Sequence, residues 1–207
     1  MSEQSESVNR EGVYIESALH YFSGMRSGNQ PPSIIIREAR SLGHLVIRGD
    51  ASNQNFLAGI EQVLGIKLPV KPRSSSISSS PLGSSLYWLG PGEWLLLVDG
   101  ETESQVEEKL RQVLTGHFSV TIVTGGQTLI NISGPNVDSV LKKSSVYDFH
   151  PNSFKVNECV QTTFAKATAL FCRRENGSFD VVIRRSFADY LARWLLDAGE
   201  EFGCSIE

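Results

Sequence analysis

The clearest pattern in the chain is a pair of short apolar runs at 86–98, LYWLGPGEWLLLV, which meet at Pro91-Gly92. Leucine, valine and aromatic residues of this kind favour β-strands. Pro91 restricts φ at the first turn position, and Gly92 can adopt the positive φ that a type II turn needs next. The segment therefore predicts a β-hairpin, and it contains no residue that indicates catalysis.

Apolar residues elsewhere recur either at every second position or at helical spacing. Their spacing predicts strands at 33–37, 42–47, 118–123 and 129–132, helices after Gly49-Asp50, near 104–114, after Gly134-Pro135 and from Ser186, and a second hairpin at about 161–183. The second hairpin turns at Asn176-Gly177, a strong hairpin signal. If that turn has two residues, Arg173 lies opposite Asp180 and can form a cross-strand ion pair. The serine-rich segment 69–85 is predicted to be a loop rather than a core strand.

The two hairpins belong to segments that share one register. Gly49 and Gly134 follow the opening strands and differ by 134 − 49 = 85, and the turn glycines Gly92 and Gly177 also differ by 177 − 92 = 85. Apolar positions of the strands and helices match at the same offset, for example Trp94 with Phe179. A register kept through strand, turn, strand and helix predicts an internal duplication.

Each repeat reads strand, helix, hairpin, helix, and the first adds a last strand at 118–123. This order is that of a ferredoxin-like unit. We therefore predict an α+β fold made of two ferredoxin-like βαββα(β) units, with antiparallel sheets and helices packed on one face. Repeat 1 covers about 42–123 and repeat 2 about 127–199. The second repeat lacks a final strand in this interpretation, and we expect the extra strand at 33–37 to supply it.

The predicted domain organisation is an N-terminal arm, 1–32, followed by the duplicated domain, 33–207. The arm is mostly polar, but its short apolar patch could dock on a surface, which makes Leu19, Tyr21 and Phe22 candidates for a partner contact. Arg184 and Arg185 are further candidates. They precede the last helix, where the helix dipole disfavours positive charge, so an anion or a partner's carboxylate could compensate them.

Composition and motifs exclude several classes of function. The formal charge of −4 gives no general attraction to nucleic acid, and no apolar run is long enough to span a membrane. Dinucleotide and phosphate-binding fingerprints are missing, the four histidines are scattered, and three cysteines without CxxC spacing indicate neither a disulfide scaffold nor a zinc site. The polar N-terminus does not resemble a signal peptide, so we expect a cytoplasmic protein. Because the motifs above are missing, we also expect no catalytic or metal-binding residues on this chain.

Three motifs carry a resemblance to a known family: LGPGEWLLL at 89–97, GQTLINISGP at 126–135 and RRSFADYLARWL at 184–195. With SALH at 17–20 and GIKLP at 65–69, they resemble the gamma subunit of heterotetrameric sarcosine oxidase. The likeness covers most of the chain. That family is related in fold to the folate-binding aminomethyltransferases, which are also built from duplicated ferredoxin-like units.

The resemblance implies a structural subunit of a complex that oxidatively demethylates sarcosine. It implies alpha, beta and delta partner subunits, with NAD and a tetrahydrofolate site on alpha, FAD and covalent FMN on beta and zinc on delta, and no cofactor on this chain. Two alternatives remain open. The chain could bind folate in its own right, or it could serve a related complex that acts on another N-methyl amino acid such as N-methylglutamate.

Overall fold

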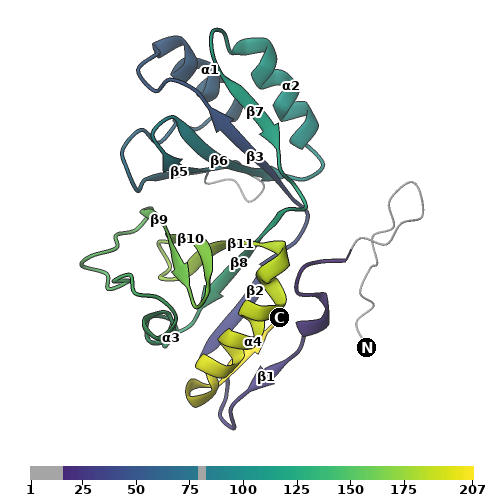
Figure 1. Ribbon diagram of the computed structural model, residues 1–207, viewed down its shortest axis with the longest axis vertical. Helices are drawn as coiled ribbons and strands as arrows, with labels where there is room; N and C mark the ends of the chain where they lie inside the picture. Colours follow the sequence, from purple (N-terminus) through teal and green to yellow (C-terminus); the bar gives the residue numbers. More distant parts are fainter. Residues whose placement is uncertain (1–15, 79–82) are drawn as a thin grey trace.

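The computed structural model describes residues 16–78 and 83–207 (Figure 1). Its strands are β1 (Arg26–Ser27), β2 (Ile34–Ala39), β3 (Leu42–Arg48), β4 (Ser75–Ile77), β5 (Ser85–Gly90), β6 (Glu93–Asp99), β7 (Ser119–Ile122), β8 (Gln127–Ser133), β9 (Cys159–Phe164), β10 (Ala167–Arg173), β11 (Phe179–Arg184) and β12 (Cys204–Ile206). Its helices are α1 (Gln54–Leu64), α2 (Glu103–Val113), α3 (Val137–Ser144) and α4 (Ala188–Ala198), with 3-10 turns η1 (His20–Phe22), η2 (Arg185–Phe187) and η3 (Glu200–Phe202). No helix among these residues is long and apolar enough to cross a membrane.

The first sheet has the strand order β4-β5-β6-β3-β7. The central hairpin, β5 and β6, forms as predicted, with Gly90 opposite Glu93 and with Gly92 at a φ of 75° in the turn. Trp94 is fully buried on β6 and donates its indole N–H to the Pro69 carbonyl at 2.7 Å. The described residues of the serine-rich segment contribute the short edge strand β4 and the first residue of β5, so for them the expectation that the segment holds no core strand is confirmed.

The second sheet has the order β1-β12-β2-β8-β11-β10-β9. β2 pairs antiparallel with β8, from Ile35 opposite Ser133 to Ala39 opposite Leu129. The N-terminal strand therefore joins the second sheet, as predicted. The expectation that the second half lacks a final strand is wrong, because β12 forms at the end of the chain and pairs parallel with the far side of β2. Its few residues after a glycine carried too weak a pattern to predict.

Helices cover one face of each sheet, and the two remaining faces pack against each other (Figure 1). α1 and α2 bury an apolar core against the first sheet, including Phe56 and Leu110, while α3, α4 and η1 cover the second. A third cluster, with Tyr87 and Leu95 from the first sheet and Leu170 and Val182 from the second, fills the space between them. The fold is therefore α+β of the ferredoxin-like type.

The strands of the second hairpin pair in a register that differs by one residue from the predicted one. Arg173 lies opposite Phe179, and Cys172 lies opposite Asp180. The loop is longer than two residues, because the Arg174 N–H binds the Ser178 carbonyl and the Gly177 N–H binds the Arg174 carbonyl. Asp180 consequently pairs with Arg174, at 3.3 Å, and not with Arg173.

Candidate partner-binding surface

A tight turn joins the two halves of the molecule between β7 and β8. Gly125 has a φ of 87°, a conformation that glycine adopts without strain, and the Gly126 N–H binds the Val123 carbonyl at 3.1 Å. The Gly126 carbonyl in turn accepts a hydrogen bond from the Arg185 backbone N–H at 3.0 Å. The turn is therefore fastened to the start of the last helical segment.

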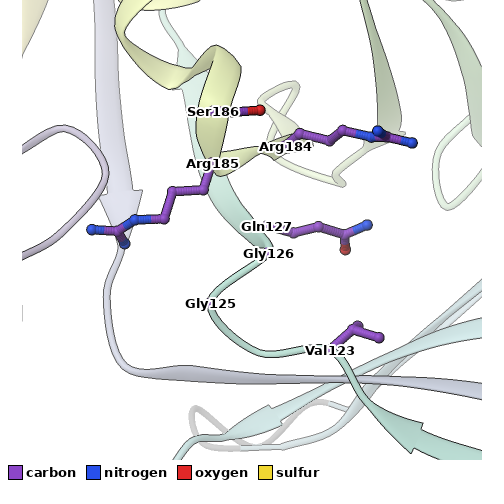
Figure 2. Close-up of a pocket in the computed structure, with 7 residues that line it drawn as sticks. All are labelled: Val123, Gly125, Gly126, Gln127, Arg184, Arg185 and Ser186. Carbon is purple, nitrogen blue, oxygen red and sulfur yellow. The ribbon is translucent and has the colours of Figure 1, made fainter.

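An open hollow of about 770 Å³ lies at this junction (Figure 2). Its lining consists of Val123, Gly125, Gly126, Gln127, Arg184, Arg185 and Ser186. Figure 2 shows the Arg184 side chain extending to the same side as Gln127, while the Arg185 side chain extends to the opposite side of the chain. Both halves contribute to the lining, because Val123 follows β7 and the other residues belong to the second half or to the turn.

The two arginines bring positive charge to the hollow without a carboxylate partner. Both are exposed, and within residues 16–78 and 83–207 neither forms an ion pair, whereas Arg37, Arg48 and Arg173 pair with Glu207, Glu93 and Asp138. The Gln127 Oε1 atom is buried and accepts no hydrogen bond from the described residues. The junction thus carries two exposed cations, and beneath its surface a buried acceptor that has no donor among the described residues.

The apolar patch of the arm docks on this chain itself. Leu19 and Phe22 are each 3% exposed and belong to the core of the second half, and the Arg193 guanidinium lies 5.2 Å from the centre of the Phe22 ring. The Glu38 carboxylate accepts the backbone N–H groups of Ala18 and Leu19 at 2.9 and 3.1 Å. Leu19 and Phe22 are therefore already covered, and of the three candidate residues in the arm Tyr21, 72% exposed, is the one that presents its ring to solvent.

The structure brings Tyr21 and Arg185 to the same part of the surface, although they lie far apart in the sequence. The Arg185 guanidinium donates to the Glu16 carbonyl, and the Tyr21 hydroxyl lies 3.3 Å from the Glu16 carboxylate. Phe187, 39% exposed, follows the hollow's Ser186. Sequence reasoning missed Gln127 and Phe187, because nothing in the local pattern showed that the turn after β7 would meet η2.

The remaining nucleophilic and titratable candidates lie apart from this surface. Burial raises the pKa of the Cys159 thiol to about 12 and of the Cys172 and Cys204 thiols to about 11, so all three stay protonated and weakly nucleophilic. His44 is buried, and neither ring nitrogen has a hydrogen-bond partner among the described residues. Those residues contain no group of three or more histidine, cysteine or acidic side chains placed to hold a metal.

Comparison with known proteins identifies the family. The family model described as sarcosine oxidase, gamma subunit family, matches residues 48–201. This chain belongs to that family. The sarcosine oxidase subunit gamma of Corynebacterium sp. (strain P-1) is 28% identical over 199 residues, which cover 96% of this chain and 94% of the relative. The subunit of an Arthrobacter species is 29% identical over 189 residues, 89% of each chain.

Two solved structures share the fold of this member of the gamma subunit family. A chain of the heterotetrameric sarcosine oxidase from Corynebacterium sp. U-96, in complex with pyrrole 2-carboxylate, superposes with a TM-score of 0.79 and 24% identity, covering 91% of this chain and 96% of that one. Aminomethyltransferase T of the glycine cleavage system from Bartonella henselae gives a TM-score of 0.61 and 12% identity, covering 84% of this chain and 48% of that one. At these identities the likeness shows the fold alone.

Proposed function

We propose that this chain is a non-catalytic structural subunit of a heterotetrameric sarcosine oxidase. The single observation that carries the proposal is the family match over 154 residues, 48–201, joined to curated gamma subunits that align along almost the whole chain. The exposed cations and rings at the hollow are consistent with a surface that meets another subunit. The buried, protonated thiols are consistent with a scaffold role.

In this proposal the partners are the alpha, beta and delta subunits, and they carry the cofactors. Alpha holds NAD and tetrahydrofolate, beta holds FAD and FMN, and delta holds zinc, whereas this chain holds none. The assembly works in the cytoplasm. Its substrate in this proposal is sarcosine. The alternative substrate is another N-methyl amino acid such as N-methylglutamate, and the described residues of this chain do not distinguish the two.

We also infer that the fold is an internal duplication, with an arm at 1–32 and a duplicated domain at 33–207. Three pairs of elements that begin at a constant offset support this: β3 and β8 (127 − 42 = 85), α2 and α4 (188 − 103 = 85), and β7 and β12 (204 − 119 = 85). Repeat 1 covers about 42–123 and repeat 2 about 127–199. β12 lies beyond that limit and corresponds to β7 in sequence order. In the sheet, however, β2 lies beside β8, the position that β7 has beside β3.

A second candidate function is folate binding by the isolated chain. The fold shared with aminomethyltransferase T is the observation that favours it. This candidate requires a carboxylate positioned for a pterin ring in a cavity. The hollow at the junction instead gathers arginines, and none of its lining residues is acidic.

Co-expression with the other subunits of its own organism tests the two candidates together. We expect an affinity tag on this chain to recover a flavin-containing complex that oxidises sarcosine, and the isolated chain to show no heat of binding with tetrahydrofolate. Recovery of this chain alone would contradict the subunit role. Binding of tetrahydrofolate by the isolated chain would favour the second candidate, and oxidation of N-methylglutamate in place of sarcosine would reassign the substrate.

A further inference from the structure

We infer that the hollow between the two halves receives an acidic segment of a partner subunit. The inference rests on the proposed function and specifies where the contact lies. Its residues are Gln127, Arg184 and Arg185 in the hollow, with the exposed rings of Tyr21 and Phe187 nearby; we refer to these five residues as the arginine surface.

The charge at the arginine surface is not compensated within the described chain. Arg184 and Arg185 are adjacent in the chain, at the end of β11 and the start of η2, and α4 follows with its positive dipole end. Neither guanidinium has a carboxylate partner in residues 16–78 and 83–207, and the Arg185 guanidinium donates only to the neutral carbonyl of Glu16. Arginine binds carboxylates strongly, often through two parallel hydrogen bonds.

A peptide fits the hollow better than a small anion does. The Arg184 and Arg185 side chains extend to opposite sides of the chain, so one small anion cannot bridge both guanidiniums (Figure 2). A peptide segment can carry several acidic side chains, so it can meet both guanidiniums. The hollow is also open to solvent, so an extended chain can lie across it.

The shape of the surface is held in place before a partner arrives. The turn at Gly125-Gly126 is fixed by its hydrogen bonds to Val123 and to the Arg185 N–H, and the arm beside it is anchored by the buried side chains of Leu19 and Phe22. A preorganised surface loses little conformational entropy on binding. Arginine and tyrosine are also enriched among the residues that dominate binding energy at interfaces.

Charge reversal on this surface tests the inference. The double variant R184E/R185E is co-expressed with the other subunits and compared with R26E/K166E, which makes the same charge change elsewhere. Arg26 lies on β1 beside the opposite end of α4, Lys166 lies in the β9-β10 turn, and both are exposed without an ion pair among the described residues. Thermal unfolding of each isolated variant shows whether the substitution damages the fold.

We expect R184E/R185E to weaken assembly by roughly tenfold or more, as measured by titrating the variant onto the complex of the other subunits, while R26E/K166E assembles like the wild type. Wild-type assembly should weaken with added salt, and R184E/R185E should have lost part of that dependence. Equal assembly of R184E/R185E and the wild type would overturn the inference while leaving the subunit role intact.

Failure of the wild type to assemble would instead contradict the proposed function itself. A small anion as the occupant is a separate outcome, tested with inorganic phosphate and tetrahydrofolate on the isolated chain. Heat of binding that R184E/R185E abolishes and R26E/K166E retains would overturn the peptide as the occupant. If neither phosphate nor tetrahydrofolate gives heat of binding, and R184E/R185E has the assembly defect, the inference is supported.

Discussion

The two sheets complete the same arrangement with strands from different places in the chain. Beside β3, the first sheet ends with β7, which follows the helix α2 directly. Beside β8, the second sheet has β2, which precedes the whole first half, and the second half's own last strand, β12, lies one position further out. The first sheet is therefore built from a continuous segment, whereas the second depends on the N-terminal segment.

The cores under the helices differ as well. The first is mainly aliphatic around Trp94, which packs against Phe56 with ring centres 6.0 Å apart. The second contains a group of aromatic rings that includes Phe179, whose ring centre lies 5.7 Å from that of Phe149 and 6.2 Å from that of Phe154. Phe149 and Phe154 come from the irregular segment between α3 and β9, so this segment supplies core volume in the second half.

Phe179→Ala should have the largest effect, because it removes a large buried ring from this aromatic group. Phe179 is fully buried, and such a truncation typically costs about 3–5 kcal/mol of unfolding free energy. Urea denaturation followed by intrinsic fluorescence measures the loss. Phe187→Ala, at a ring that is 39% exposed, is the matched control and should change stability by less than about 1 kcal/mol. Equal costs for the two variants would contradict a role for the Phe179 ring in the core of the second half.

Arg173→Met tests the polar element of that aromatic core. The side chain of Arg173 is 8% exposed, pairs with Asp138 at 2.8 Å, donates to the Phe149 carbonyl at 2.7 Å and lies 4.6 Å from the Phe179 ring centre. Its removal leaves Asp138 and the carbonyl without their donor, so we expect a loss of about 3 kcal/mol.

Arg48→Met is the comparison in the first half. The Arg48 side chain is 63% exposed, so its pair with Glu93 should contribute at most about 1 kcal/mol. The same denaturation series measures both arginines. A smaller loss for Arg173→Met than for Arg48→Met would show that burial does not distinguish the two pairs.

Leu19→Ala tests the dependence of the second half on the N-terminal segment. Leu19 is buried in that core, and its truncation should cost about 2 kcal/mol, the lower end for leucine, because the short η1 segment can adjust. Tyr21→Ala, two residues away and 72% exposed, should leave stability within about 0.5 kcal/mol. A neutral Leu19→Ala would mean that the arm is not an integral part of the second half.

Local patterns predicted most of the fold but only part of the candidate surface. The hairpin at Pro91-Gly92 and the entry of 33–37 into the second sheet followed from turn chemistry and from counting strands. The burial of Leu19 and Phe22 did not, because an apolar patch docks equally well on its own chain or on another. The meeting of Gln127 with Arg184 and Arg185 depends on how the strands of the second sheet align, and a single sequence does not encode that alignment in any local motif.

His44→Leu should have the smallest effect on stability. It tests a position at which β3 and β8, the first strands of the two halves, carry different residues. At the offset of 85 residues, His44 on β3 corresponds to Leu129 on β8, where an apolar side chain packs between the sheets. Burial lowers the pKa of His44 below its ordinary value of 6.5, so the folded protein holds the ring neutral. The unfolded chain binds a proton more readily, and stability is therefore retained above pH 6.5 and lost as the pH falls below it.

Replacing His44 by the leucine of its counterpart removes this source of acid sensitivity. At pH 7.5 the variant should be as stable as the wild type or more stable by roughly 1 kcal/mol, because two ring nitrogens no longer lie buried without partners. Between pH 7.5 and 5 its unfolding free energy should decline less steeply. His117→Leu, at an exposed histidine of the same half, should keep the wild-type decline. Parallel pH profiles for His44→Leu and the wild type would contradict this prediction. They would show that His44 does not make the protein less stable in acid than a leucine at the same position does.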